Sequence, residues 1–231
     1  MFTGIIEHLG TIESLDLHRD GGRVTIHAPA LGPSLAVANS IAVNGCCLTI
    51  VKLEGSRFSA DLSGETIRRT SFGAKAGGLK VGARVNLEQP LTAGREFGGH
   101  FVLGHVDGIS EVVALEREGN SENWNYSVRI PGDCIRYIVN KGSITIDGIS
   151  LTVALAYSES TGSSKSPYFV VNIAVIPYTY EHTNIRDRKP GDKVNLEGDV
   201  LGKYIDRYLE ARQSGYSETR LSLEELKAQG F

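Results

Sequence analysis

The chain has 231 residues, of which 41% are hydrophobic and 22% are charged, and this composition is typical of a folded globular protein rather than a disordered or fibrous one. Its formal net charge is -3 and it has no Lys/Arg cluster that could bind nucleic acid or an anionic membrane. A small molecule is therefore the expected ligand. The N-terminal stretch lacks a basic leader and no apolar run reaches membrane length, which predicts a cytosolic protein.

A tandem repeat is the strongest signal along the chain. Four segments of the first half recur in the second half in the same order: "TGIIEHLGTIESL" with "LGHVDGISEVVAL", "NGCCLTI" with "DGISLTV", "SGETIRRTSF" with "IPYTYEHTNI", and "VGARVNLE" with "PGDKVNLE". These matches predict two copies of one module. The extra residues fall in "GAKAGG" and "STGSSKSP", which are expected to be surface loops.

Within each copy the hydrophobic pattern has the period of two that is typical of β-strands. "SIAVNGCCLTIV" contains two short runs hinged at Asn44-Gly45, and "GSITIDGISLTVA" repeats this around Asp147-Gly148. Asn-Gly and Asp-Gly readily adopt the positive φ angles that two-residue hairpins require. The predicted fold is mainly β, with two duplicated antiparallel Greek-key β-barrels in tandem followed by a C-terminal α-helix.

Three units are expected, at residues 1–97, 98–199 and 200–231, with the first boundary in "QPLTAGREFGG". A helix is predicted over residues 200–213, and its apolar face is expected to make a subunit contact. The face is formed by Leu201, Ile205, Tyr208 and Leu209. The tail beyond it either forms a second short helix from Ser222 or stays mobile.

The repeated blocks, together with "MFTGII", "GGHFVLGHVDG" and "ETIRRTSFG", resemble the α-type riboflavin synthases over about residues 1–212. Several blocks in one order are a more specific signal than any single short motif. The resemblance implies that each active site binds two molecules of 6,7-dimethyl-8-ribityllumazine and passes a four-carbon unit from one to the other. The implied products are riboflavin and 5-amino-6-ribitylamino-pyrimidinedione, and the implied reaction uses neither a cofactor nor a metal.

The same resemblance implies a homotrimer whose C-terminal helices associate, and it admits lumazine synthase as a further partner. In the family, the first barrel of one subunit meets the second barrel of its neighbour at the active site. A duplicated fold suits this reaction because it offers two near-equivalent pockets in which identical substrates can be held face to face.

Individual residues are matched to family sites by the same resemblance. The catalytic set is Cys47, His105, Ser150 and Asp199. The substrate-binding set is Phe2, Thr3, Gly4, Ser40, Thr49, Thr66, His100, Lys141, Ser143, Thr152 and Thr179. Cys47 and Ser150 are equivalent in the repeat, so the two pockets are expected to bind the same molecule and treat it differently.

The cysteines leave two interpretations open. From the residues alone, Cys46, Cys47 and Cys134 are expected to be free thiols, and free cysteines are most often buried structural residues. The resemblance favours a functional role for Cys47. That role is either a nucleophile toward the ring carbon that bears the reacting methyl group or a contact that orients the ring, and a nucleophile would need a depressed pKa.

Other polar residues also have alternatives. His100 and His105 lie on a predicted strand at positions that face opposite sides, so a metal site is not expected, and proton transfer or orientation is the predicted role. Asp199 either binds a ribityl hydroxyl or a histidine, or caps the helix that begins near Val200. Lys141 is expected to face solvent unless the cleft closes over it.

Two other classes of protein compete with an enzyme. The duplicated barrel also resembles lumazine- and flavin-carrying proteins, which keep the fold while losing reactive side chains. This chain retains Cys47 and both histidines, which favours an enzyme. An oligonucleotide-binding barrel would need basic charge and interleaved surface aromatics, which the sequence lacks.

Overall fold

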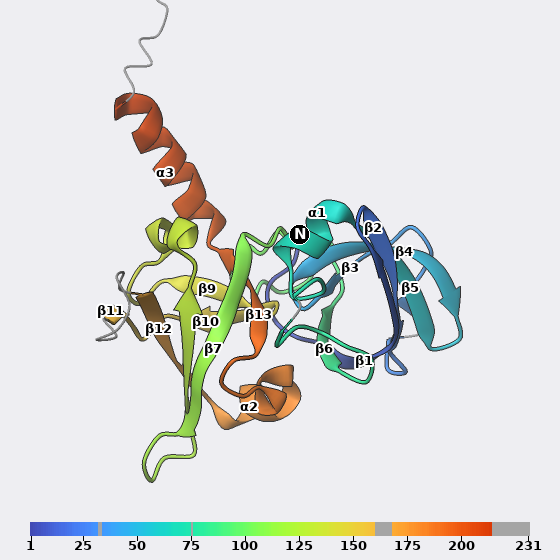
Figure 1. Cartoon of the computed structure of the whole chain (residues 1–231), viewed down its shortest axis with the longest axis horizontal. Helices are drawn as coiled ribbons and strands as arrows, with labels where there is room; N and C mark the ends of the chain where they lie inside the picture. The colour runs from blue at the N-terminus through green and yellow to red at the C-terminus, as the bar shows by residue number, and fades with distance from the viewer. Residues whose placement is uncertain (32–33, 75, 160–167, 214–231) are drawn as a thin grey trace, which may run out of the picture.

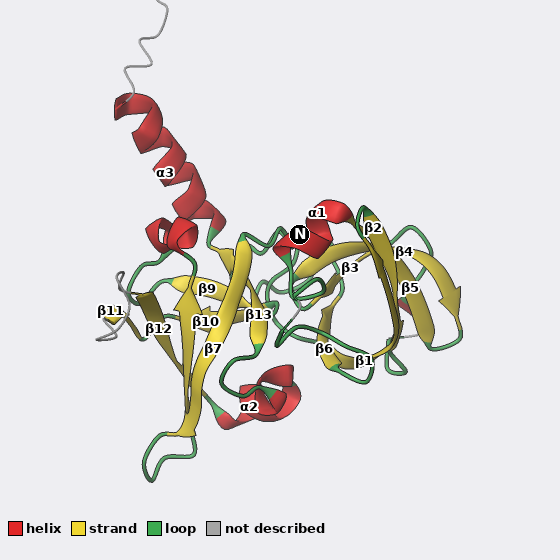
Figure 2. Ribbon diagram, in the orientation of Figure 1, coloured by secondary structure: helices red, strands yellow, loops and turns green. Residues whose placement is uncertain are grey.

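The computed structural model describes residues 1–31, 34–74, 76–159 and 168–213. Two β units lie side by side, and one helix projects away from the second unit (Figure 1). Strands dominate both units, and the helices other than the projecting one are short (Figure 2). None of the described helices combines the length and apolar character needed to cross a membrane.

Among the described residues, six strands and one α-helix build the first unit. The strands are β1 (His8–His18), β2 (Gly21–His27), β3 (Ser40–Val43), β4 (Cys46–Glu54), β5 (Arg57–Ser63) and β6 (Arg84–Glu88), and the helix is α1 (Gly64–Arg69). The strands pair antiparallel in the order β1-β2-β5-β4-β3-β6, and β6 pairs back with β1. The first unit is therefore a closed barrel.

The second unit repeats this order. Its strands are β7 (Gly108–Arg117), β8 (Trp124–Ile130), β9 (Ser143–Ile146), β10 (Ile149–Thr152), β11 (Leu155–Glu159), β12 (Tyr168–Val175) and β13 (Lys193–Gly198). Its helices are η2 (Gly132–Tyr137), α2 (Pro177–His182), η3 (Asn184–Asp187) and α3 (Val200–Gln213). Even a local irregularity recurs, because the register shift between Ile12 and Ser14 in β1 reappears between Val112 and Ala114 in β7.

The copies differ along one strand. β4 runs unbroken through a register shift between Ile50 and Lys52, whereas its counterpart is divided into β10 and β11 at Val153 and Ala154. The second sheet is consequently a curled half-barrel of seven strands whose two edge strands follow one another in the chain. The predicted fold class is confirmed, and only the first copy closes through a continuous ladder of hydrogen bonds.

The two predicted hairpin turns are present and meet each other. Asn44 and Gly45 have φ angles of 45° and 73°, and Asp147 and Gly148 have φ angles of 47° and 80°. A Cβ atom on Gly45 would lie 2.7 Å from the backbone nitrogen of Gly148. Glycine is therefore required at this contact both for its positive φ and for the absence of a side chain.

Each unit has its own hydrophobic core. One buried cluster includes Ile26 and Phe58, and the other includes Tyr126, Ile146 and Ile173. Burial of each such side chain contributes about 1.5–3 kcal/mol through the removal of apolar surface from water. Each copy thus folds around a core of its own, as expected for a duplicated module.

A buried polar network joins the two units in matching pairs. The side-chain amide of Asn86 donates to the Asp147 carbonyl oxygen (2.9 Å), and the amide of Asn195 donates to the Asn44 carbonyl oxygen (2.8 Å). The backbone nitrogens of Asn86 and Asn195 donate in turn to the side chains of Asn44 (2.7 Å) and Asp147 (2.8 Å). Because buried polar groups are costly unless paired, this network fixes how the units sit together.

The predicted helix at residues 200–213 is confirmed as α3. Lys203 holds it to Asp107 (2.6 Å), and Arg136 holds it to Glu210 (2.9 Å). Its predicted apolar face is open in the single chain, with exposed fractions of 50–62% for Leu201, Ile205, Tyr208 and Leu209. The helix therefore has an anchored base and an uncovered apolar side.

One local prediction was wrong. Residues 98–107, expected to be a strand carrying His100 and His105, are irregular apart from an isolated bridge between Phe2 and Val102. The strand argument against a metal site therefore fails, although within the described part of the chain no three His, Cys, Asp or Glu side chains are grouped to hold an ion. The predicted loop "STGSSKSP" and the helix from Ser222 lie outside the described residues.

Candidate active site

Each unit contributes a chain segment to the other unit. The backbone nitrogen of Cys47 donates to the carbonyl oxygen of Gly104 (2.9 Å), and the backbone nitrogen of Ser150 donates to that of Gly4 (2.7 Å). Between these contacts, Phe2 and Val102 exchange two backbone hydrogen bonds (2.7 and 3.2 Å). Cys47 therefore lies on one side of the paired Phe2 and Val102 segments, and Ser150 lies on the other side.

A pocket of about 410 Å³ opens beside Cys47, a size typical of small-molecule sites. One wall comes from β4 and α1 of the first unit, and the other comes from residues 104–107. Three predicted site residues line it together: Cys47, Thr66 and His105. The remaining lining residues are Cys46, Glu65, Arg69, Thr70, Gly104, Val106 and Asp107.

The two adjacent cysteines have different surroundings, as strand alternation predicts. Cys46 belongs to the barrel core, and burial raises the pKa of its thiol to about 12, with further increases from Cys47 and Glu197. Cys47 is half-buried on the outer face of β4, packed against Phe2 and Val102. Cys47 is therefore the more accessible of the two thiols at the pocket.

Helix α1 forms the rim of this pocket. Ser63 caps the helix by accepting a hydrogen bond from the backbone nitrogen of Thr66 (3.0 Å), which fixes this predicted site residue in the first turn. Glu65 binds Arg69 (2.8 Å), and Arg69 also donates to the carbonyl oxygen of Asp107 (3.2 Å). The rim is consequently charged and connects both units.

The second-unit site is built around a histidine with two hydroxyl partners. The Nδ1 atom of His100 lies 2.7 Å from the Ser150 hydroxyl, and its Nε2 atom lies 3.0 Å from the Thr145 hydroxyl. Burial lowers the pKa of His100, and the nearby charge of Asp199 opposes this only in part. The ring is therefore neutral near pH 7, so it carries one donor and one acceptor, and each can be matched by a hydroxyl.

Helix α2 is the second-unit counterpart of the rim helix α1. Thr179 occupies its third position, as Thr66 does in α1. Here the rim is aromatic, because the rings of Tyr178 and His182 stack with centroids 4.1 Å apart. The Tyr178 side chain is 67% exposed, so this rim offers an uncovered ring to a ligand or a neighbouring subunit.

Pairs of hydroxyl residues extend both sites along the outer faces of the hairpins. Ser40 pairs with Thr49 between β3 and β4, and Ser143 pairs with Thr152 between β9 and β10. Thr49 and Thr152 share a strand face with Cys47 and Ser150 because they follow at two-residue spacing. Lys141 precedes β9 with a φ of 66° and is exposed, as predicted for an open cleft.

The N-terminal residues predicted to bind substrate are held inside the structure. Phe2 is fully buried and packs with Val102 and Cys47, so its ring supports the pocket wall from behind. Thr3 is also buried, and Gly4 adopts a φ of 77° that places its carbonyl oxygen on Ser150. This segment therefore shapes the second-unit site through its backbone.

Two glutamates that sequence analysis did not single out hold the exchanged segments. Glu88 accepts hydrogen bonds from the backbone nitrogens of Thr3 (2.6 Å) and Gly4 (2.9 Å) and from the Thr3 hydroxyl (2.8 Å). Glu197 accepts from the backbone nitrogens of Leu103 (2.7 Å) and Gly104 (3.0 Å). The signal that could have found them is the twin "VNLE", which ends in the same charged residue at two positions of the barrel wall.

Both carboxyl groups are almost completely buried, and burial changes their ionisation. It raises the pKa of Glu88, opposed by the hydrogen bonds from Thr3 and Gly4. It raises the pKa of Glu197 to about 7, opposed by the bond from Leu103 and the charge of Lys203. Both groups accept backbone hydrogen bonds best when ionised.

Asp199 is placed where both of its predicted roles have a basis. Its side chain accepts a hydrogen bond from the backbone nitrogen of Leu201 (2.9 Å), as the capping alternative predicted. Its charge also raises the pKa of His100. The residue therefore links the start of α3 to the histidine of the second-unit site.

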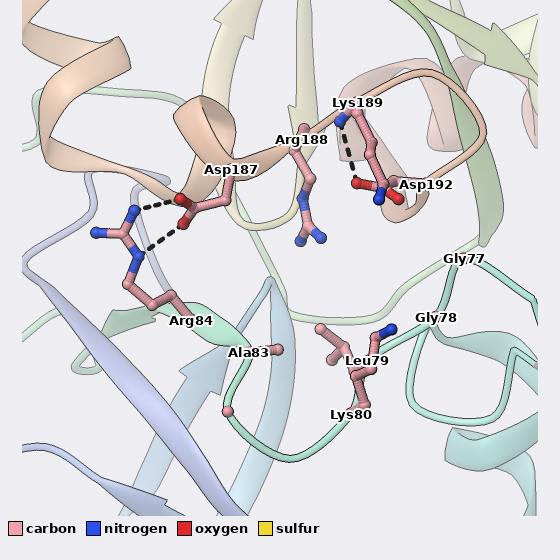
Figure 3. Close-up of a pocket in the computed structure, with 11 residues that line it drawn as sticks. Gly77, Gly78, Leu79, Lys80, Ala83, Arg84, Asp187, Arg188, Lys189 and Asp192 are labelled. Carbon is pink, nitrogen blue, oxygen red and sulfur yellow. Dashed lines mark hydrogen bonds and ion pairs between the residues drawn. The ribbon is translucent and has the colours of Figure 1, made fainter.

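A second cleft of about 460 Å³ lies between residues 77–84 and residues 187–192 (Figure 3). Its charged side chains are largely engaged with one another: Arg84 forms a bidentate pair with Asp187, and Arg188 binds the buried Asp147. None of the predicted site residues lines it. We attribute this cleft to the junction between the units, which the Arg84–Asp187 pair bridges.

Comparison with known proteins agrees with these observations. The family model described as the lumazine-binding domain matches residues 3–90 and 103–199. The chain is 40% identical to riboflavin synthase of Actinobacillus pleuropneumoniae and 36% identical to that of Bacillus subtilis, in each case over 100% of both chains. This chain belongs to the riboflavin synthase family. The family predicted from the sequence blocks is therefore confirmed.

Solved structures similar to this riboflavin synthase family member include two complexes of LumP. The complex with 6,7-dimethyl-8-(1'-D-ribityl) lumazine has a TM-score of 0.69 at 26% identity and covers 85% of this chain and 98% of that one. The complex with riboflavin has a TM-score of 0.71 at 27% identity and covers 86% and 99%. The fold of this family member is thus also found in proteins solved with lumazine and flavin ligands.

Proposed function

We propose that this chain catalyses the dismutation of 6,7-dimethyl-8-ribityllumazine, in which one molecule donates a four-carbon unit to another. The products are riboflavin and 5-amino-6-ribitylamino-pyrimidinedione. The observation that carries the proposal is the full-length similarity to riboflavin synthases. It is supported by a site that occurs twice with different side chains, because a reaction between two identical molecules needs two binding places and a directed transfer needs them to differ.

The proposed chemistry relies first on placement. Holding two rings in a reactive arrangement contributes up to roughly 7–11 kcal/mol of barrier reduction in well-aligned cases. In the first-unit site, Cys47 acts on the ring carbon that bears the reacting methyl group, and His105 on the opposite wall takes part in proton transfer from that methyl group. In the second-unit site, the Ser150 hydroxyl, oriented by neutral His100, binds the second ring.

The remaining predicted residues bind and position the substrates. Thr66 and Thr179 contact the ring edge or the ribityl chain from the two short helices. The hydroxyl pairs of the hairpins and Lys141 bind ribityl oxygens, and Asp199 acts through His100. For the hairpin hydroxyls, support comes from their position on the same strand faces as Cys47 and Ser150.

The proposed assembly is a homotrimer. Residues 1–97 and 98–199 form the two lumazine-binding units, residues 200–231 form the oligomerisation segment, and the first unit of one subunit faces the second unit of its neighbour. The uncovered apolar face of α3 supports this arrangement. A cytosolic location remains a prediction of the sequence, and an association with lumazine synthase is proposed from the resemblance alone.

The activity is tested with purified full-length protein under anaerobic conditions and without added cofactor. Lumazine should be converted to riboflavin with two substrate molecules consumed for each product molecule. The absence of riboflavin formation would reject the proposal. Tight fluorescent binding of one lumazine per chain without turnover would instead identify a carrier, the alternative that the similarity to LumP favours.

The assembly is tested by charge substitutions on α3. Ile205→Lys combined with Leu209→Lys should give a folded monomer with activity reduced at least roughly tenfold, since the positive charges oppose burial of the apolar face. Arg207→Glu is the matched control, because this side chain is 75% exposed and already charged. Light scattering reports the mass, and an intact trimer of the double variant would contradict the proposed role of α3.

A further inference from the structure

Glu88 and Glu197 each belong to one unit and hold a segment that borders the site of the other. Glu197 lies on β13 of the second unit, but the backbone that it binds forms a wall of the pocket beside Cys47. Glu88 lies on β6 of the first unit, but the backbone that it binds contacts Ser150. Neither carboxylate lines the pocket described above.

The connection from Glu197 to Cys47 is short. Glu197 accepts two backbone hydrogen bonds, one of them from Gly104, and the carbonyl oxygen of Gly104 accepts the hydrogen bond from Cys47. A Cβ atom at Gly104 would lie only 2.6 Å from the Cβ of Cys47. Because the segment packs so closely on Cys47, its displacement would change the position and exposure of the thiol and the position of His105.

The connection from Glu88 to Ser150 has the same form. Glu88 binds Gly4, whose carbonyl oxygen accepts the hydrogen bond from Ser150. A Cβ atom at Gly4 would lie 2.7 Å from the Cβ of Ser150. Each series of contacts therefore begins at a glutamate of one unit and ends at the central site residue of the other unit.

We propose that Glu197 is a positioning residue for the first-unit site and Glu88 is a positioning residue for the second-unit site, each acting across the junction through the segment it anchors. The ligand at these sites is the lumazine of the proposed function, so the kinetic part of this inference rests on that function. The positioning itself does not, because it is a property of the free protein.

The free protein is tested through the reactivity of Cys47 toward iodoacetamide, located by peptide mass spectrometry. Glu197→Gln replaces one of the two accepting oxygens by an amide donor that faces a backbone donor, and it should raise the alkylation rate of Cys47 roughly tenfold. Glu88→Gln is the matched variant and should change that rate much less than Glu197→Gln, because its segment hydrogen-bonds to Ser150 and reaches Cys47 only through the Phe2 ring. Equal rates in both variants, or no change in Glu197→Gln, would overturn the proposal.

Charge is separated from position by a third variant. Glu197→Asp keeps the negative charge but shortens the side chain, so the reach to both backbone nitrogens is lost. Cys47 should again react faster than in the wild type, by a similar factor. A wild-type rate in Glu197→Asp would show that the carboxylate charge, rather than the anchored segment, controls the thiol, and would also overturn the proposal.

Kinetics of the full-length enzyme provide the functional test. Variants of either glutamate should lower kcat roughly tenfold or more while KM changes little, since the lost alignment matters most in the transition state. A KM increase at unchanged kcat would contradict positioning. If no protein form makes riboflavin, the proposed function fails, whereas the alkylation result still decides the positioning.

Should the glutamate variants fail to fold, hydrogen exchange of the wild type tests the same anchor. Besides the amides that it binds, Glu197 faces Lys203 on α3, Asp107 before β7, and Cys46 on β4. Protection of a peptide spanning residues 99–106, corrected for the intrinsic rate, should fall as pH rises through 7, because opening exposes the carboxyl to water, where its pKa is lower, so the closed segment binds the proton more tightly. Protection that is independent of pH in this range would overturn the role of Glu197.

Discussion

The first-unit site and the second-unit site share a backbone and differ in their side chains. In each, the same strand of a hairpin meets a segment from the other unit, and each unit has a short helix with a threonine at its third position. The differences are Cys47 against Ser150, His105 against Ile5, and the Glu65–Arg69 ion pair against the Tyr178–His182 stack. One backbone plan therefore supports a charged site that contains a thiol and a hydroxyl-rich, aromatic one.

The junction between the units shows why both copies retain an asparagine at the equivalent positions Asn86 and Asn195. Asn86 and Asn195 each bond to the hairpin turn of the other unit, so a change at either position leaves buried polar groups unpaired on both sides. Side chains that face a pocket have no such reciprocal partner. Duplication thus preserves the paired contacts and leaves the pocket-facing positions free to acquire different chemistry.

The largest expected effect comes from making the two sites alike at their central residue. Cys47→Ser copies the second-unit residue into the first-unit site. If the thiol forms a bond to the ring carbon, turnover should fall roughly 1,000-fold, about 4 kcal/mol of barrier, while lumazine affinity changes little. Steady-state kinetics and equilibrium binding measure the two quantities separately.

Cys134→Ala is the matched control for this change. It removes another thiol, which is 3% exposed in the core of the second unit, so it should reduce stability and leave turnover per folded molecule unchanged. Equal losses of turnover and affinity in Cys47→Ser would indicate that the thiol only orients the ring.

Features that depend on residues close together in the sequence could be predicted from the sequence. The hairpins could be predicted because Asn-Gly and Asp-Gly are local signals, and α3 could be predicted from its apolar spacing. Cys47, Thr66 and His105 were identified through the family resemblance, and the structure does bring them to one pocket. The family assignment needed only the order of the blocks.

The failures concern contacts between residues far apart in the chain. The segment with His100 reads as a strand in the sequence, but its hydrogen-bond partners lie near Phe2 in the other unit. Glu88 and Glu197 ended strands in the sequence and carried no sign that they would be buried. Their partners are backbone nitrogens, which have no signature in a sequence.

A smaller effect is expected when the two glutamates are compared across pH. Folding raises the pKa of Glu197 from 4.5 to about 7, so the native state binds this proton more tightly than the unfolded state. Its contribution to the free energy of unfolding is therefore highest below pH 4.5 and falls by about 3 kcal/mol as pH rises past 7. Glu197→Gln should remove this loss, so the difference in stability between variant and wild type should shift in favour of the variant between pH 5 and pH 8.

Urea unfolding at one fixed protein concentration measures this change. The concentration must be constant because association stabilises the folded chain. Glu88→Gln is the comparison, and its pH dependence should shift in the same direction because burial also raises the pKa of Glu88. A wild-type pH profile in Glu197→Gln would contradict the ionisation assigned to this residue.

The smallest expected effect concerns His100, whose site has a negative neighbour. Asp199→Asn removes the charge that raises the pKa of His100 while retaining an oxygen that caps α3, so the helix should stay intact. The pKa of His100 should fall further below its usual value, because burial then acts without opposition from Asp199. A histidine NMR titration measures it, and circular dichroism checks the helix. Thr145→Ala is the control, since it removes a hydroxyl partner of His100 without changing the charge. An unchanged titration midpoint in Asp199→Asn would restrict Asp199 to helix capping and separate it from the second-unit site.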